Sequence, residues 1–109
     1  MKEEMWGEFC EIFGVTPRNR VIEFFLEGRE MDFSIGDVAK EIGMNRATTY
    51  NTIEELIQEG YIIPTRKVSG GQLYKLNEEK DEVKILINAF NLVLKNIMKD
   101  HQKVKKIYA

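Results

Sequence analysis

The chain has 109 residues, of which 43% are apolar, and 16 Lys and Arg against 18 Asp and Glu leave a net charge of −2, the composition of one globular domain. A single cysteine excludes a disulfide scaffold, and one cysteine with one histidine is too few for a zinc site. The sequence also lacks the phosphate-binding loop, nucleophile elbow and dinucleotide-binding turn of common enzyme classes, so we expect no enzyme, no metal and no cofactor.

No apolar run approaches the roughly 20 residues that a helix needs to cross a bilayer. The first eleven residues carry four acids and one Lys, whereas a secretory leader begins with basic and then apolar residues. We therefore expect a cytoplasmic protein with no membrane partner.

The N-terminal quarter of the chain predicts two helices. Apolar residues recur at three- and four-residue steps over 3–13, which indicates a short helix with an acidic outer face. Cys10 lies within this helix and is expected to fill the core. Thr16 and Pro17 form an N-cap and first-turn pair for a second, largely buried helix that ends near Gly28.

Two further helices, separated by a short turn, follow a polar connection over 29–33 whose last residues are extended. Ser34 is the expected N-cap of the first of them, and Gly43 ends it by adopting a left-handed conformation. Asn45 caps the second, which ends at Gly60. Its inward-facing stripe is expected to consist of Thr49, Ile53, Leu56 and Ile57.

A β-hairpin is predicted over 61–77, because extended segments flank the turn sequence Ser69-Gly70-Gly71. Pro64 has no N–H to donate, so its strand should lie at a sheet edge. The hairpin contains three basic residues and no acid, whereas the preceding segment 44–60 sums to −2. The hairpin is therefore the basic element of the chain.

A long helix is predicted from 79 to 108, since no Gly or Pro interrupts it and its acidic start and basic end suit the helix dipole. About 28 residues at 1.5 Å each give a length of ~42 Å, longer than the small domain before it. Apolar residues at alternating four- and three-residue steps form a seam typical of helix bundles. The seam consists of Val83, Ile87, Phe90, Leu94, Ile97, His101, Val104 and Tyr108.

This seam, extended by Trp6 and Phe9 of the first helix, is expected to form the interface of a homodimer. His101 interrupts the apolar pattern, and we interpret it as a residue that sets helix register, with a pH sensor as the alternative. The alternative to a dimer core is a small-molecule pocket framed by Trp6 and Phe9 of the first helix with Phe90, Leu94 and Ile97 of the last, although the sequence identifies no effector.

The order of elements over 16–77 resembles a winged helix-turn-helix domain. The sequence FSIGDVAKEIGMNRATTY at 33–50 is similar to the helix-turn-helix core, and IEELIQEGYI at 53–62 resembles the recognition-helix exit of MarR, ArsR and related prokaryotic regulators. The resemblance implies a mainly α fold with a small β-hairpin (α+β), in which the N- and C-terminal helices form the dimer interface. It divides the chain into a DNA-binding domain, 1–78, and a dimerisation helix, 79–109, within one structural unit.

In this fold the second helix of the pair, about 45–59, enters the major groove of double-stranded DNA. With the inner stripe buried, four residues turn outward on its first two turns: Arg46, Thr48, Tyr50 and Asn51. Arg46 suits a bidentate pair with guanine and Asn51 one with adenine, Thr48 suits a phosphate or a base, and Tyr50 offers a ring and a hydroxyl. The alternatives are solvated surface residues and, for Tyr50, a half-buried ring.

The basic hairpin resembles the wing of these regulators. Arg66 and Lys67 would contact the DNA backbone or minor groove, while Gly70 and Gly71 allow a close approach. The alternative is that Arg66 and Lys67 are edge-strand charges that discourage aggregation.

Two functions follow from the sequence. The first is a homodimeric transcriptional regulator that binds a pseudo-palindromic DNA site. The second is a winged-helix adaptor that binds proteins and not DNA, because a fold alone does not determine function. The basic hairpin and the polar first turns of the recognition helix favour the first.

Overall fold

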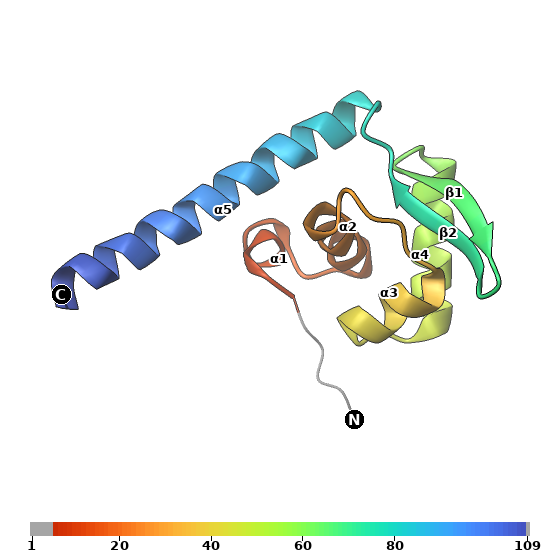
Figure 1. Ribbon diagram of the computed structural model, residues 1–109, viewed down its shortest axis with the longest axis horizontal. Helices are drawn as coiled ribbons and strands as arrows, with labels where there is room; N and C mark the ends of the chain where they lie inside the picture. Colours follow the sequence, from red (N-terminus) through yellow and green to blue (C-terminus); the bar gives the residue numbers. More distant parts are fainter. Residues whose placement is uncertain (1–5, 109) are drawn as a thin grey trace.

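The computed structural model describes residues 6–108 and the side chains of residues 6–100. Four short helices are followed by an antiparallel hairpin and a long terminal helix (Figure 1). The elements are α1 (Glu8–Phe13), α2 (Pro17–Glu27), α3 (Ile35–Ile42), α4 (Arg46–Gln58), β1 (Ile62–Val68), β2 (Gly71–Leu76) and α5 (Asp81–Tyr108). The prediction of a mainly α fold with a small β-hairpin is thus confirmed.

The helix boundaries follow from local capping, as the sequence predicts. Thr16 Oγ1 accepts the N–H of Asn19 at 3.0 Å, and Ser34 Oγ accepts that of Asp37 at 3.1 Å. Asn45 Oδ1 caps α4 by accepting two backbone N–H groups. Gly43 ends α3 with φ of 67°, a left-handed conformation that glycine adopts without strain.

The first helix is shorter than predicted. It begins at Glu8 instead of residue 3, Trp6 and Gly7 precede it, and residues 3–5 lie outside the described residues. The physical reason is a cap from α2, because the Glu23 carboxylate accepts the N–H of Gly7 at 2.6 Å and that of Cys10 at 2.9 Å. These two bonds hold the first turn of the helix at Gly7.

The core lies where α1, α2, α3 and α4 meet the base of the hairpin and the first half of α5. Phe25, Ile53 and Leu76 are fully buried, and Phe9 of α1 packs against Phe90 of α5 with ring centroids 6.5 Å apart. Cys10 is also fully buried, as its predicted role in the core requires. Each element therefore contributes large apolar side chains to one cluster.

The sheet consists of two strands, β1 and β2, so both lie at an edge. Strand β1 pairs with β2 in antiparallel register, and Phe33, which precedes α3, forms an isolated bridge with Tyr74. Pro64 lies in an edge strand, which confirms the sequence prediction. The register of the hairpin shifts between Pro64 and Lys67.

Among the residues with described side chains, the buried ones of α5 lie in its first half. Val83, Phe90 and Val93 are buried, whereas Leu94 and Ile97 are 42% and 45% exposed. The rest of the helix extends past α1 and away from the other elements (Figure 1). None of the helices in the described residues is long and apolar enough to span a membrane.

Candidate nucleic-acid interface

Helix α4 is held by its inner face and leaves its outer face to solvent. Thr49, Ile53 and Leu56 are fully buried against α2 and α3, as predicted, and Ile57 is partly buried. The Thr49 hydroxyl donates to the Asn45 carbonyl at 2.8 Å, so this buried polar group is satisfied within the helix. The opposite side of α4 is therefore available for contact.

The four predicted recognition residues all lie on that exposed side: Arg46, Thr48, Tyr50 and Asn51. The Arg46 guanidinium lies beside Gly36 of α3, where a methyl group would be 3.8 Å from its central carbon. Thr48 and Asn51 line a shallow hollow together with Thr16 and Pro17 at the start of α2. The first two turns of α4 thus form one polar surface with neighbouring helix ends.

Tyr50 lies on the side of α4 that faces the hairpin. It is 51% exposed, which places it between the two alternatives of a contact residue and a half-buried ring. Burial raises the pKa of Tyr74 on β2, and the nearby Glu54 and Tyr50 raise it further. Tyr50 therefore lies at the junction of α4 and the hairpin.

The far end of α4 is tied to α2 and to the hairpin. Arg18 forms an ion pair with Glu59, and this hydrogen bond raises the pKa of Arg18. The Arg18 guanidinium lies 4.9 Å from the ring centre of Tyr61, which Lys80 also approaches, at 5.3 Å. Segment 44–60 contains three acids, and the charge of one of them, Glu59, is compensated by Arg18.

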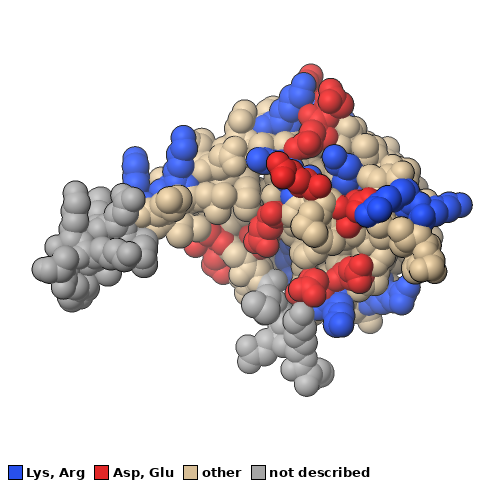
Figure 2. Space-filling model, in the orientation of Figure 1, with Lys and Arg blue, Asp and Glu red and all other residues tan. Residues whose placement is uncertain are grey.

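The hairpin carries the predicted basic residues on its exposed strand. Arg66 and Lys67 are both exposed on β1, and a methyl group at Gly70 would meet no described atom within 4 Å. Figure 2 shows Lys and Arg side chains projecting from the side of the molecule that Figure 1 assigns to the hairpin. The hairpin therefore presents positive charge beside the polar surface of α4.

Arg66 has a partner that the sequence analysis did not identify. Its Nε donates to Asp32 Oδ2 at 3.0 Å and its Nη2 donates to Asp32 Oδ1 at 3.2 Å. Hydrogen bonds from Arg66 and Thr65 hold the pKa of Asp32 at about 2, below its ordinary value of 3.8. Asp32 and Arg66 are 34 residues apart, so no local sequence pattern links them.

The predicted dimer-interface residues divide into two groups. Phe9, Val83 and Phe90 are buried within the single chain, because α1 and the first half of α5 cover each other, and little of these side chains is left for a partner. Ile87 is partly buried in the same cluster. The exposed predicted residues are Trp6, Leu94 and Ile97, while the side chains of His101 and Val104 lie outside the described ones.

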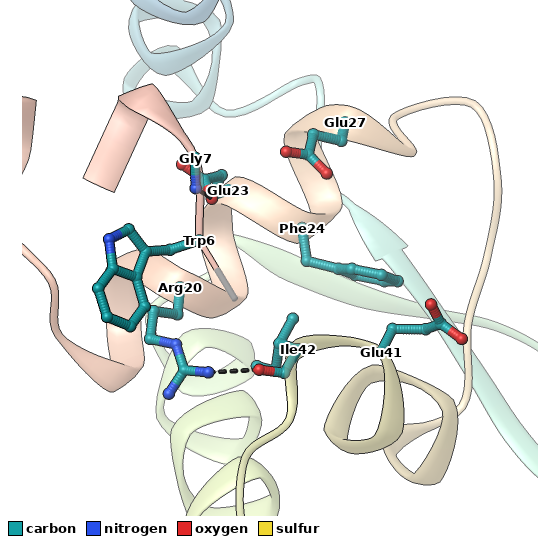
Figure 3. A pocket seen from close by; sticks show the side chains of 8 residues that line it. All are labelled: Trp6, Gly7, Arg20, Glu23, Phe24, Glu27, Glu41 and Ile42. Atoms are coloured by element: carbon teal, nitrogen blue, oxygen red, sulfur yellow. Dashed lines mark hydrogen bonds between the residues drawn. The ribbon is translucent and has the colours of Figure 1, made fainter. Parts of the chain in front are cut away.

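A cavity of about 310 Å³ separates the start of α1 from α3, with α2 as its floor (Figure 3). Trp6 lines this cavity from one side, and Glu41 and Ile42 of α3 line it from another. Arg20 donates to the Ile42 carbonyl at the end of α3, as the dashed line in Figure 3 shows. The cavity therefore lies between the first helix and the helix-turn-helix pair.

Known families and solved structures contain the same arrangement of helices. Residues 20–63, which contain most of α2 and all of α3 and α4, match the family model of the IclR helix-turn-helix domain. No curated protein is a significant match to the chain.

Several solved structures share the fold at low sequence identity. The adhesin competence repressor AdcR of Streptococcus pyogenes has a TM-score of 0.64 at 12% identity, and the match covers 92% of this chain and 72% of that one. MepR, a transcription regulator of the Staphylococcus aureus multidrug efflux pump MepA, has a TM-score of 0.60 at 16% identity, with coverage of 86% and 68%. The transcriptional repressor BigR of Xylella fastidiosa has 0.56 at 23%, with 72% of each chain covered.

The fold and the helix-turn-helix match together define a class. The chain has a winged helix-turn-helix fold, in which α4 is the second helix of the pair and the β1–β2 hairpin follows it. Within this fold, residues 20–63 are similar to the helix-turn-helix domain of the IclR family.

Proposed function

We propose that the protein is a sequence-specific DNA-binding transcriptional regulator that acts as a homodimer in the cytoplasm. The observation that carries the proposal is the polar, exposed surface of the first two turns of α4 beside a basic hairpin. A helix fits the major groove, where each base pair presents a distinct pattern of donors and acceptors. Arg46 is suited to guanine and Asn51 to adenine, while Thr48 and Tyr50 complete the contact surface.

The hairpin acts as the wing on the DNA backbone or in the minor groove. Arg66 and Lys67 are exposed side by side on β1, and the glycine tip is unobstructed. Positive side chains at this place neutralise phosphates whatever the sequence. We therefore assign affinity mainly to the hairpin and base selection mainly to α4.

The homodimer forms through α1 and the second half of α5. Ile12 and Phe13 of α1 are more than half exposed, and Leu94 and Ile97 of α5 are more than two fifths exposed. Each large apolar side chain contributes about 1.5–3 kcal/mol when it is fully buried. A two-fold pair places two α4 helices in successive major grooves about 34 Å apart, so the site has inverted symmetry.

The similarity of residues 20–63 to the IclR helix-turn-helix domain and the regulator structures with the same fold support a prokaryotic regulator of this general type.

Binding to duplex DNA tests the proposal. The target is first selected from mixed genomic fragments at low salt, and affinity is then measured against salt concentration on the selected duplex and on a scrambled one. Arg46→Ala should cost about 1–3 kcal/mol on the selected site and relax preference at one base position. Arg66→Ala with Lys67→Ala should weaken binding to both duplexes and reduce the log–log salt slope by up to about two per subunit.

Lys95→Ala is the matched control, because it removes one exposed positive charge from α5, away from α4 and the hairpin. It should leave sequence preference unchanged. If the α4 and hairpin variants both bind DNA like the parent, neither element is the contact surface. The chain is then better explained as a protein-binding adaptor.

A further inference from the structure

Asp32 lies in the connection between α2 and α3 and reaches across to the hairpin. Its carboxylate accepts three side-chain hydrogen bonds, two from Arg66 and one from Thr65 Oγ1 at 2.7 Å. The next residue, Phe33, exchanges two backbone hydrogen bonds with Tyr74 of β2. The carboxylate is therefore attached to a point where the backbone is fixed to the sheet.

The bonds to Asp32 are made at an irregular part of β1. Thr65 and Arg66 lie in the register shift between Pro64 and Lys67, where the regular pairing of β1 with β2 is interrupted. Side-chain bonds from both residues to Asp32 attach β1 to the α2–α3 connection at this point. Asp32 thus fixes both the course of β1 at the shift and the side chain of Arg66.

The geometry of the pair leaves part of the Arg66 guanidinium available. Asp32 binds the side edge, formed by Nε and one hydrogen of Nη2. A guanidinium has five N–H donors, so the end edge, formed by Nη1 and the other Nη2 hydrogen, is a second fork that fits a phosphate or a base edge. The Arg66 side chain is 67% exposed and that of Asp32 is 17% exposed, so the arginine is the outer member of the pair.

We propose that Asp32 is a specificity-determining positioning residue, which orients the Arg66 guanidinium so that its end edge meets one acceptor on the bound DNA. This inference depends on the proposed function. An arginine that is already held in one orientation loses less side-chain freedom on binding, which favours the site whose geometry matches it. The carboxylate also repels phosphates of any sequence and so weakens non-specific binding. Both effects raise the ratio of specific to non-specific affinity.

The test compares Asp32→Asn with Glu30→Gln by measuring affinity for the selected duplex and for a scrambled duplex of equal length. Both changes remove one negative charge from the same connection, but Glu30 is exposed and makes no bond to the hairpin among the described contacts. Both variants should bind the scrambled duplex more tightly than the parent. Only Asp32→Asn should lower the specificity ratio, by about five- to tenfold.

Arg66→Ala and the double variant Asp32→Asn with Arg66→Ala separate positioning from general stability. A merely structural role of Asp32 would reduce both affinities by one factor and leave their ratio unchanged, with or without Arg66. If Asp32 acts by positioning Arg66, the ratio should fall in Asp32→Asn and should show no further fall when Arg66 is already absent. Circular dichroism of each variant verifies that the fold is retained.

Two results overturn the proposal while leaving DNA binding intact: an Asp32→Asn ratio equal to that of Glu30→Gln, or an equal fall of the ratio in the Arg66→Ala background. A parent protein that binds neither duplex overturns the proposed function, and this inference with it. The parent measurement therefore distinguishes the two failures.

Discussion

Replacing Glu23 with Gln should loosen the first helix. Glu23 is buried, with 5% of the residue exposed, and its carboxylate accepts the N–H groups of Gly7 and Cys10. Gln offers one oxygen in place of two, so one buried N–H loses its acceptor. Loss of a hydrogen bond to a charged group costs about 1.5–3 kcal/mol, which is roughly a 10- to 150-fold increase in the opening of α1.

Cys10 reports this opening directly, because it is the only cysteine in the chain. Burial, reinforced by the charge of Glu23, raises the pKa of the Cys10 thiol from 9.0 to about 12. The reactive thiolate is therefore about 1,000-fold rarer at pH 8 than in an ordinary cysteine, and alkylation proceeds through the open form. Iodoacetamide labelling followed by mass spectrometry should be at least tenfold faster in Glu23→Gln.

Hydrogen exchange of the α1 amides provides a second measurement that does not depend on the acidity of the thiol. Glu27→Gln is the matched control, one turn further along α2. Burial and the neighbouring Glu23 raise the pKa of Glu27, so removing its charge relieves repulsion and should leave α1 closed. If Glu23→Gln is labelled and exchanged at the parental rates, the cap bonds do not hold α1 and the reasoning is wrong.

Three further predictions concern the proposed dimer, the hairpin and the turn. Leu94→Asp with Ile97→Asp should produce a monomer by light scattering, since both side chains are exposed in one chain; a parent that is monomeric at micromolar concentration would contradict the dimer. Asp32 has a lowered pKa of about 2, so its pair with Arg66 is complete above about pH 4 and is lost as pH falls toward 2. A carboxyl NMR titration of Arg66→Ala should show the pKa of Asp32 shifted back toward 3.8. A midpoint for Asp32 already near 3.8 in the parent protein would refute the pairing. Gly43→Ala should lower the free energy of unfolding by about 1 kcal/mol in urea denaturation, because φ at this position is 67°, and an unchanged midpoint would count against this reason.

The features that the sequence predicted well are those that depend on neighbours in the chain. Thr16, Ser34 and Asn45 cap helices because each side chain reaches an N–H two or three residues ahead. The burial of one face of α4 follows in the same way from helical periodicity. Such interactions need no knowledge of the tertiary fold, which is why the order of elements could be predicted.

The apolar seam of α5 illustrates what periodicity cannot resolve. Regular spacing predicts which side chains share a face, but burial by the same chain and burial by a partner produce the same spacing. In the structure α1 covers Phe90 and Val93, and the face beyond them is exposed at Leu94 and Ile97. Val93 lay outside the predicted seam, because its burial depends on where α1 lies against α5.

The contacts that the sequence could not predict are made by charged residues far apart in the chain. Glu23 shortens α1 from a distance of 16 residues, and Asp32 binds Arg66 from 34 residues away. Both acids resemble ordinary solvated residues in the sequence, where most acids are exposed. Only the fold brings each beside its partner.

Helix α2 connects the proposed dimer face to the proposed DNA face through three charged side chains within six positions. Arg18 binds Glu59 at the end of α4, Arg20 binds the carbonyl at the end of α3, and Glu23 caps α1. Because α1 belongs to the proposed dimer face, these contacts would set the distance between the two α4 helices of the proposed dimer. Loosening α1 through Glu23→Gln should therefore weaken binding to a complete two-fold site more than binding to a single half-site, since only the complete site requires a fixed spacing. Equal weakening on both duplexes would mean that α1 does not transmit the spacing.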